Sequence, residues 1–224
     1  MNWQPFWLTA QLATLTTLLL LLLCIPLAWW LVFVQPAQQQ RRKAVVEVLC
    51  NLPLVLPPTV LGFYLLLLFS PNHGVGHWLQ QWFGVRLAFS FTGLVLGSVV
   101  FSLPFMLQPL LGAFRQVPFS LIEASRCCGK NEWQSLWRIV LPLSKPGLLA
   151  GIVLSFAHTV GEFGVVLMLG GNIPGKTQVA SIALYQEVEA LNYAVAHRYA
   201  LVLVLFAFVV LLGLRALQRQ QERH

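Results

Sequence analysis

Glutamate and histidine are the side chains in this sequence that could do chemistry, and both are scarce. Among 224 residues there are seven acidic side chains, all glutamate, and five histidines. Glu162 lies within a long apolar stretch, and His158 precedes it by four residues. A helix would place both on one face, where they could pair. A carboxylate in such surroundings is costly, so Glu162 either has a function or bridges neighbouring helices.

A second candidate is a phosphate-binding loop. Residues 170–177 fit the pattern G-x-x-x-x-G-K-[ST]. A loop of that kind needs a buried strand before it, a helix after it and an aspartate that organises Mg²⁺, and the sequence contains no aspartate. Because an apolar segment precedes the stretch and Gly and Pro are frequent within it, we interpret it as a turn at a helix end.

The cysteines do not form a recognisable metal or redox motif. Cys24 and Cys50 lie in apolar runs, Cys127 and Cys128 are adjacent, and no C-x-x-C or Cys/His spacing occurs. The sequence also lacks a nucleophile motif. We therefore expect no catalytic residue, no metal site and no cofactor.

The segments that carry these residues are too apolar to form the surface of a protein that is dissolved in water. Hydrophobic residues make up 58% of the chain and charged residues 9%, whereas soluble domains carry about 25% charged residues. The stretch from Leu12 to Val34 has no formal charge, and as a helix it is about 34 Å long, enough to cross a bilayer core of about 30 Å. The chain is expected to be an all-α polytopic membrane protein in a single transmembrane domain, 1–224. Its five predicted spans are 12–34, 45–69, 87–114, 147–170 and 199–217.

Proline interrupts the second of these spans. Pro57 and Pro58 are adjacent in its middle, preceded by Asn51 and Pro53. Proline lacks a backbone N–H, so the helix should be kinked or broken near Pro57. The carbonyls freed there need protein or water partners, and the region should therefore face other helices or a cavity.

Basic residues predict the orientation in the membrane. With alternating spans, eleven of the fourteen Lys and Arg residues fall on one face, and only Arg86, Lys176 and Arg198 on the other. The positive-inside rule makes the richer face cytoplasmic. The amino terminus is then outside and the carboxyl terminus inside. The net charge of +7 needs no nucleic-acid partner, because it has this topological origin.

Two connections are longer than turns. The cytoplasmic loop 115–146 should form two small amphipathic helices, the first between Pro118 and Gly129, the second capped by Asn131 and ended by Pro142. Its periodicity alone also fits a passive hairpin at the membrane surface. The external segment 171–198 should contain a short surface helix within 179–193.

The loop resembles the EAA loop of ABC importer permeases. Glu123-Ala124 is followed by Gly129, then by nine residues and by Ile139-Val140-Leu141-Pro142, and Ser125 replaces the second alanine of the motif. In that family the short helix sits in a groove of a cytoplasmic ATPase and passes its movement to the spans. The resemblance implies ATPase-coupling roles for Glu123, Ala124, Ser125, Gly129, Ile139, Leu141 and Pro142.

Further segments resemble molybdate permeases, and sulfate and tungstate permeases share much of the pattern. They are 51–62, 156–164, 172–177 and 183–185. The resemblance implies a type I ABC importer permease that works as a homodimer in the bacterial inner membrane. Its partners would be two cytoplasmic ATPase subunits, which hydrolyse ATP, an external solute-binding protein and the lipid bilayer. The substrate would be an oxyanion, molybdate or alternatively tungstate or sulfate. The candidates for its pathway and gate are His158, Glu162, Pro57 and Pro58.

Two other function classes fit less well. A membrane-embedded enzyme would need acids and bases converging from several spans, and only His158 and Glu162, on one span, are found. An ATPase-independent secondary transporter tends toward internal repeats and paired broken helices. Here one Pro-interrupted span stands without an evident counterpart, and the loop motif would have no role.

Overall fold

The computed structural model describes residues 2–34, 40–72 and 74–221, and every regular element within them is helical. This confirms the all-α prediction. The elements are α1 (Gln4–Phe33), α2 (Gln40–Asn51), η2 (Leu52–Leu54), α3 (Pro58–Phe69), α4 (Gly74–Phe83), α5 (Phe91–Gln116), α6 (Phe119–Cys127), α7 (Glu132–Ser135), η3 (Leu136–Val140), α8 (Leu141–Leu143), α9 (Lys145–Gly161), α10 (Gly164–Gly170), α11 (Ala180–Glu189) and α12 (Tyr193–Gln221).

Among the described residues, three helices are long and apolar enough to cross a membrane unaided: α1, α5 and α12. Two bent pairs bring the number to five if each pair is one span. The first of these pairs runs from α2 and η2 into α3 and α4, and the second leads from α7 through α8 into α9. The number of spans predicted from the sequence is therefore compatible with the structure.

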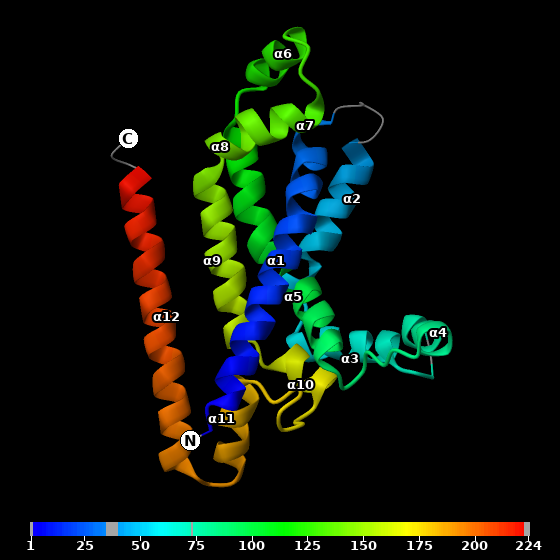
Figure 1. Cartoon of the computed structure of the whole chain (residues 1–224), viewed down its shortest axis with the longest axis vertical. Coiled ribbons are helices and arrows are strands. Elements are labelled where there is room, and N and C mark those ends of the chain that lie inside the picture. Colours follow the sequence, from blue (N-terminus) through cyan, green and yellow to red (C-terminus); the bar gives the residue numbers. More distant parts are fainter. Residues whose placement is uncertain (1, 35–39, 73, 222–224) are drawn as a thin grey trace.

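The second span is broken at its prolines. A bend of 112° separates the part ending at Leu54 from the part beginning at Pro58. Pro57 is the extended residue before α3, and Pro58 occupies the first turn, where a missing N–H costs nothing. As a result α3 turns away from the direction of α2 and leads to α4 at the side of the bundle (Figure 1).

The fourth predicted span, 147–170, is interrupted near its end. Helix α9 ends at Gly161, Glu162 has an extended backbone with φ −69° and ψ 136°, and α10 begins at Gly164. The glycines on either side favour a helix only weakly, and the Glu162 carbonyl accepts a hydrogen bond from Ser181 Oγ at 2.6 Å. The second span therefore does have a counterpart, because the fourth is interrupted too.

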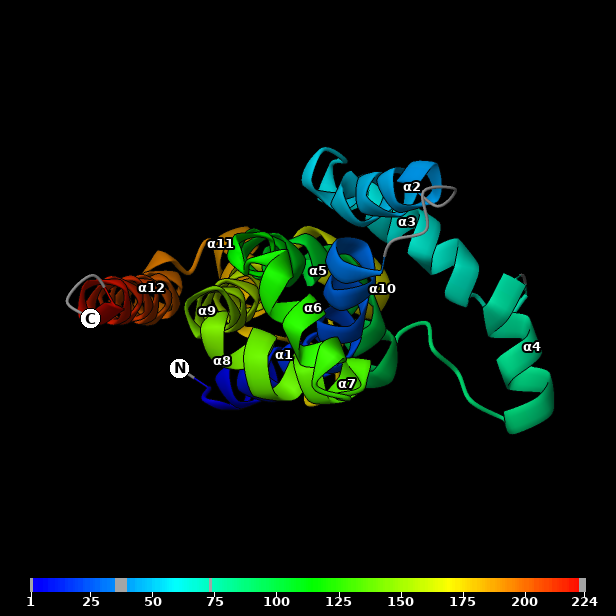
Figure 2. The same ribbon diagram turned by 90° about the horizontal axis from the view of Figure 1, so that it is seen from above.

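Helix α5 forms the centre of the bundle and packs against α1, α9 and α10. Glycines permit the close approach of α9: a Cβ at Gly151 would lie 3.0 Å from the Met106 carbonyl oxygen, and one at Gly147 would overlap Ala113. Helix α12 stands apart, and α12 and α4 lie on opposite sides of the central helices (Figure 2). In the most apolar stretch of α12, which is 18 residues long, only 6% of the residues are buried.

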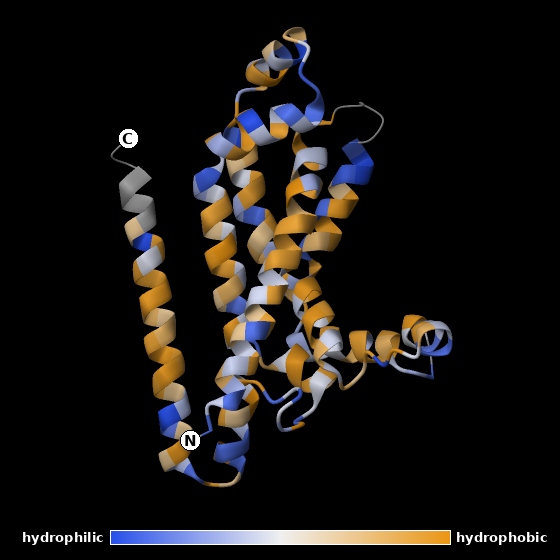
Figure 3. Ribbon diagram, in the orientation of Figure 1, coloured by the Kyte–Doolittle hydropathy of each residue, from blue (hydrophilic) through white to orange (hydrophobic). Residues whose placement is uncertain are grey.

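The two ends of the bundle differ in what they carry. Helices α6 and α7 lie at the same end as the last turns of α12, whereas the start of α1, α10 and α11 lie at the opposite end (Figure 1). The middle of α12 is hydrophobic and is flanked by hydrophilic residues (Figure 3). This arrangement is the one that alternating spans require, with loop 115–146 and the carboxyl terminus on one side.

Candidate functional site

The loop helices form where local chemistry predicts them. Pro118 immediately precedes α6, and Gly129 ends it with a left-handed φ of +73°. Asn131 opens α7 with a capping box: its side chain accepts from the Gln134 N–H at 2.7 Å, and the Gln134 side chain accepts from the Asn131 N–H at 3.3 Å. Such reciprocal bonds satisfy N–H groups that have no partner inside the helix.

One face of the loop packs inward. Ile122, Ser125, Ser135 and Leu136 are buried, and the Ser125 and Ser135 hydroxyls are hydrogen-bonded at 2.7 Å. The serine that replaces alanine in the motif therefore has a partner in the second loop helix. The substitution links α6 to α7, and each of these two buried hydroxyls has the other as a hydrogen-bond partner.

The opposite face of the loop is open. Glu123, Ala124 and Gly129 are exposed, and a Cβ added at Gly129 would meet no atom within 4 Å. Trp133 and Trp137 are also exposed and lie edge to face, with ring centroids 5.6 Å apart. Small residues and aromatic side chains together offer a surface on which another protein could pack closely.

The prediction that Pro142 ends the second loop helix was wrong. The helix widens into a π-helical turn over η3, in which the Leu141 N–H bonds the Leu136 carbonyl, and it continues through Pro142 to Leu143. The backbone hydrogen bonds before Pro142 already reach back five residues and not four, so the missing N–H of Pro142 does not end the helix. Ser144 follows, and the chain bends by 79° into α9. Of the other predicted coupling residues, Leu141 is buried and Ile139 half-buried.

At the other end of α9, Glu162 is 5% exposed. Ser98 Oγ of α5 donates to Glu162 Oε2 at 3.2 Å. Glu162 Oε1 is buried and has no hydrogen-bond partner among the described residues. The side-chain carboxyl group of Glu162 thus faces α5. The main-chain carbonyl of the same residue accepts a hydrogen bond from Ser181 of α11.

His158 has its own partner on α5. The Ser102 hydroxyl lies 3.0 Å from His158 Nδ1, and the ring stacks on Phe105 with centroids 3.8 Å apart. Phe101 lies on another side of the ring, 4.9 Å from its centroid. The possible pairing of His158 with Glu162 was wrong, because each side chain bonds a different serine. The sequence does contain a sign of these contacts. Ser98 and Ser102 are four residues apart, as are His158 and Glu162, which they contact.

The two helix breaks meet at one cavity. The cavity, of about 560 Å³, is lined by Pro58, Thr59, Phe101, Ala157, His158, Gly161, Glu162, Phe163 and Gly164. A Cβ at Gly164 would lie 2.7 Å from the Pro58 Cβ, so α3 and α10 touch where each begins. Three predicted gate candidates line this cavity. The fourth, Pro57, precedes α3 and is not among the lining residues.

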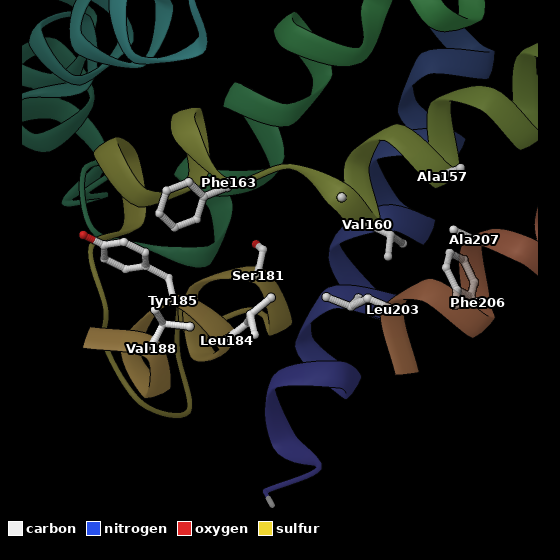
Figure 4. Close-up of a pocket in the computed structure, with 11 residues that line it drawn as sticks. Ala157, Val160, Phe163, Ser181, Leu184, Tyr185, Val188, Leu203, Phe206 and Ala207 are labelled. Carbon is white, nitrogen blue, oxygen red and sulfur yellow. The ribbon is translucent and has the colours of Figure 1, made fainter. Parts of the chain in front are cut away.

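A second cavity, of about 440 Å³, lies between α9, α11 and α12 (Figure 4). Its lining is Ala157, Val160, Gly161, Phe163, Ser181, Leu184, Tyr185, Val188, Leu203, Phe206 and Ala207. Only Ser181 and Tyr185 contribute side-chain hydroxyls. An anion would lose its hydration there without adequate replacement, so the cavity suits apolar groups.

The phosphate-loop pattern at residues 170–177 forms a closed turn. Thr177 is buried, its hydroxyl donates to the Gly170 carbonyl at 2.7 Å, and it accepts from the Ile173 N–H at 3.2 Å. Gly171 and Gly175 have φ of +61° and +75°. The threonine that a phosphate loop would offer to Mg²⁺ is used to close the turn.

Two charged residues of α2 contact other helices near the loop end of the bundle. Glu47 forms an ion pair with Arg115 of α5 at 2.9 Å. Lys43 donates to the Leu31 carbonyl at 3.0 Å, near the end of α1. In the part of the chain that the structure describes, no cluster of His, Cys, Asp and Glu could hold a metal ion.

Comparison with known proteins agrees with these features. Residues 37–223 match the family described as binding-protein-dependent transport system inner membrane component. The molybdenum transport system permease protein ModB of Azotobacter vinelandii is 46% identical over 95% of this chain and 92% of its own length. ModB of Escherichia coli K12 is 36% identical over 84% and 80%. The sulfate transport system permease protein CysT of that bacterium is 31% identical over 81% and 65%.

Solved structures of low sequence identity share the fold. A bacterial alginate ABC transporter, in complex with a pentasaccharide-bound periplasmic protein, has a TM-score of 0.76 at 20% identity, covering 97% of this chain and 78% of that one. The inward-facing MetNI methionine ABC transporter has a TM-score of 0.71 at 18% identity, covering 95% and 94%. The chain belongs to the family of binding-protein-dependent transport system inner membrane components.

Proposed function

We propose that this chain is the permease subunit of an ATP-binding-cassette importer that moves molybdate inward across the bacterial cytoplasmic membrane. The observation that carries the proposal is the exposed face of α6 and α7, which bears the motif at the family spacing. The ModB relative, similar over nearly the whole length of both chains, favours molybdate. Sulfate is the second candidate, because a sulfate permease is also similar, and tungstate shares the oxyanion chemistry.

The working unit is a homodimer with two cytoplasmic ATPase subunits and an external solute-binding protein. A related fold in complex with a periplasmic protein supports the last of these partners. The ATPase subunits hydrolyse ATP, and this chain has no catalytic site of its own. The end that carries loop 115–146 is cytoplasmic, and the amino terminus is outside.

Movement passes along α9 from the loop to the helix breaks. ATP-driven closure of the ATPase subunits displaces α6 and α7. The helix that continues from α7 through Pro142 transmits this displacement across the bend at Ser144 to α9. The far end of α9 is joined by Glu162 and Phe163 to α10, which packs on α3. A shift of α9 therefore moves the contact between Pro58 and Gly164, which we assign to the outer gate.

The cavity at the breaks belongs to the pathway. His158 and Glu162 both line it, and the hydrogen bond that the Glu162 carboxyl group accepts from Ser98 holds α9 on α5. A carboxylate in the pathway would repel a dianion, so its orientation toward α5 suits passage of an oxyanion. Weak binding along the pathway favours release to the cytoplasm.

Uptake by the reconstituted transporter tests the proposal. Proteoliposomes containing the chain, its ATPase and its binding protein should accumulate radiolabelled molybdate only with internal ATP. Unlabelled tungstate and sulfate measure the selectivity. Accumulation without the ATPase would instead indicate a secondary transporter, and uptake of sulfate in preference to molybdate would replace the proposed substrate.

A further inference from the structure

Helix α4 carries an apolar face that the rest of the described chain does not cover. Val75, Trp78 and Trp82 follow one another at spacings of three and four residues, so they lie on one side of the helix. Trp78 is 52% exposed and Trp82 is 72% exposed, and Phe83 beside them is 65% exposed. The remaining side of the helix carries Gly76, His77, Gln80 and Gln81.

The direction of α4 is fixed by contacts with the end of α3. Gly76 is buried against the Phe69 carbonyl so closely that a Cβ would overlap it. His77 Nδ1 lies 2.9 Å from the Pro71 carbonyl oxygen. The Val85 N–H bonds the Leu79 carbonyl at the far end of the helix. The helix is thus held in one direction, projecting to the side of the bundle (Figure 2).

The chemistry of this face fits a lipid interface better than a charged protein surface. No Lys, Arg, Asp or Glu occurs from residue 71 to residue 85. Tryptophan is enriched where headgroups meet acyl chains, because its ring is apolar and its indole N–H needs a polar partner. An amphipathic helix that lies in this region buries its apolar face about 5–10 Å into the boundary.

Neighbouring surfaces continue the apolar face of α4. On α3, Phe63, Tyr64, Leu67 and Leu68 are exposed. Trp3 and Trp7 at the start of α1 are also exposed. The start of α1 and α4 both lie in the half of the bundle away from the loop helices (Figure 1). Exposed aromatic residues gathered toward one side of a membrane protein are typical of a belt at that membrane surface.

We infer that α4 is an interfacial helix, with Trp78 and Trp82 inserted between the headgroups and acyl chains of the leaflet at the amino-terminal end of the bundle. The partner is the bilayer itself. The inference concerns lipid contact only and holds whichever solute the protein transports. The helix thereby ties α3, whose first turn touches Gly164, to the membrane surface.

Nitroxide labels on two sides of α4 test this inference. In a variant with the four native cysteines replaced, Trp82→Cys reports the apolar face and Gln81→Cys the polar side next to it, about 100° around the helix. The labelled full chain is placed in nanodiscs of phosphatidylethanolamine and phosphatidylglycerol. Electron paramagnetic resonance then measures collision with oxygen, which is enriched in lipid, and with a water-soluble nickel chelate. We expect the oxygen-to-nickel ratio at residue 82 to exceed that at residue 81 several-fold.

Two results would overturn the inference. Equal, nickel-dominated collision rates at both positions would place α4 in water. Low collision rates with both reagents at residue 82, with broadening from spin–spin contact, would place the face against a second copy of the chain. Trp78→Cys repeats the measurement one turn away, so that failure of the Trp82→Cys variant to fold does not remove the test.

Discussion

Single residues on α5 determine how the polar groups of α9 are accommodated. Ser98 donates to Glu162, and Ser102 lies within hydrogen-bond distance of both His158 and Thr159. Buried polar groups without such partners would cost free energy, so the two serines stabilise the contact between α5 and α9. The structural role considered for Glu162 from its sequence position is therefore visible in its contacts, independently of any role in the pathway.

Replacing Glu162 separates these roles. Glu162→Gln keeps the size of the side chain and a carbonyl oxygen that can accept from Ser98, so the protein should assemble normally. Glu162→Ala leaves the Ser98 hydroxyl without this partner and should destabilise the fold by about 1–3 kcal/mol. Thermal unfolding in detergent measures the difference. Normal assembly and unchanged uptake of the Gln variant would exclude a need for the charge in transport.

The pair formed by Ser125 and Ser135 allows a double-mutant cycle. Ser125→Ala removes one hydroxyl, while Ser135 retains the Asn131 carbonyl as an acceptor at 3.1 Å. We expect a coupling free energy of about 0.5–1.5 kcal/mol between the two substitutions, measured by thermal unfolding of the single and double alanine variants. Additive effects would show that the hydrogen bond does not link α6 to α7.

At the scale of elements, the loop helices are built by local chemistry and present an open face, whereas α3 and α10 are defined by their contact with each other. Gly62 of α3 also lies close to α10, with its added Cβ 2.9 Å from the Met168 Cβ. Two short helices, each joined to a longer one by a break, therefore pack as one unit. Movement of either break should displace both.

Substitution of Gly129 tests the docking face. Gly129→Leu should uncouple ATP hydrolysis from uptake without preventing membrane insertion, because its side chain would project from the open face of the loop. Gly129→Ala is the matched control: both variants bear the strain of a positive φ, about 1–2 kcal/mol, but alanine adds little bulk. ATPase activity and uptake are measured together. Unaltered uptake of the Leu variant would argue against docking at this position.

Substitution of Gly164 tests the proposed gate. Gly164→Ala places a methyl group against Pro58 and should separate α3 from α10, reducing uptake while the loop still couples to the ATPase. Gly112→Ala serves as control, because its Cβ would meet no atom within 4 Å. Uptake of molybdate into proteoliposomes is measured for the Gly164→Ala and Gly112→Ala variants. Equal uptake by both variants would mean that the contact of the two breaks does not control passage.

At the scale of the whole molecule, the bundle has one end with the loop helices and one with the helix breaks, separated by the long helices α1, α5 and α9 (Figure 1). The proposed coupling site and the proposed gate therefore lie far apart and communicate through α9, which contacts α5 and α1 along its length. The exposed apolar surface of α12 is available to lipid or to the second copy in the proposed homodimer.

The orientation of these ends is tested by labelling. In a variant without the native cysteines, Lys130→Cys in the loop should react with a membrane-impermeant maleimide only from the cytoplasmic side. Lys176→Cys, in the turn after α10, should react only from outside. Inverted membrane vesicles and intact spheroplasts give the two accessibilities. The reverse pattern would overturn the assignment of the cytoplasmic face.

The sequence by itself determined the features that depend on neighbouring residues. Apolar runs predicted the long helices α1, α5 and α12. Pro57 and Pro58 predicted the break before α3, and Asn131 predicted the start of α7. In each case the cause lies within one or two helical turns: a missing N–H or a capping side chain. These local effects are independent of the rest of the chain, so they could be predicted without a fold.

The tertiary structure decided the features that join distant residues. Glu162 meets a serine 64 positions away, and Glu47 pairs with an arginine 68 positions away. The fourth span breaks without a proline, where Ser181 of another helix bonds the Glu162 carbonyl. Such partners are chosen by the packing of whole helices, because the hydrogen bonds and close contacts become possible only when the chain has folded. Local sequence therefore specifies where helices form and end, while packing specifies which polar groups meet between them.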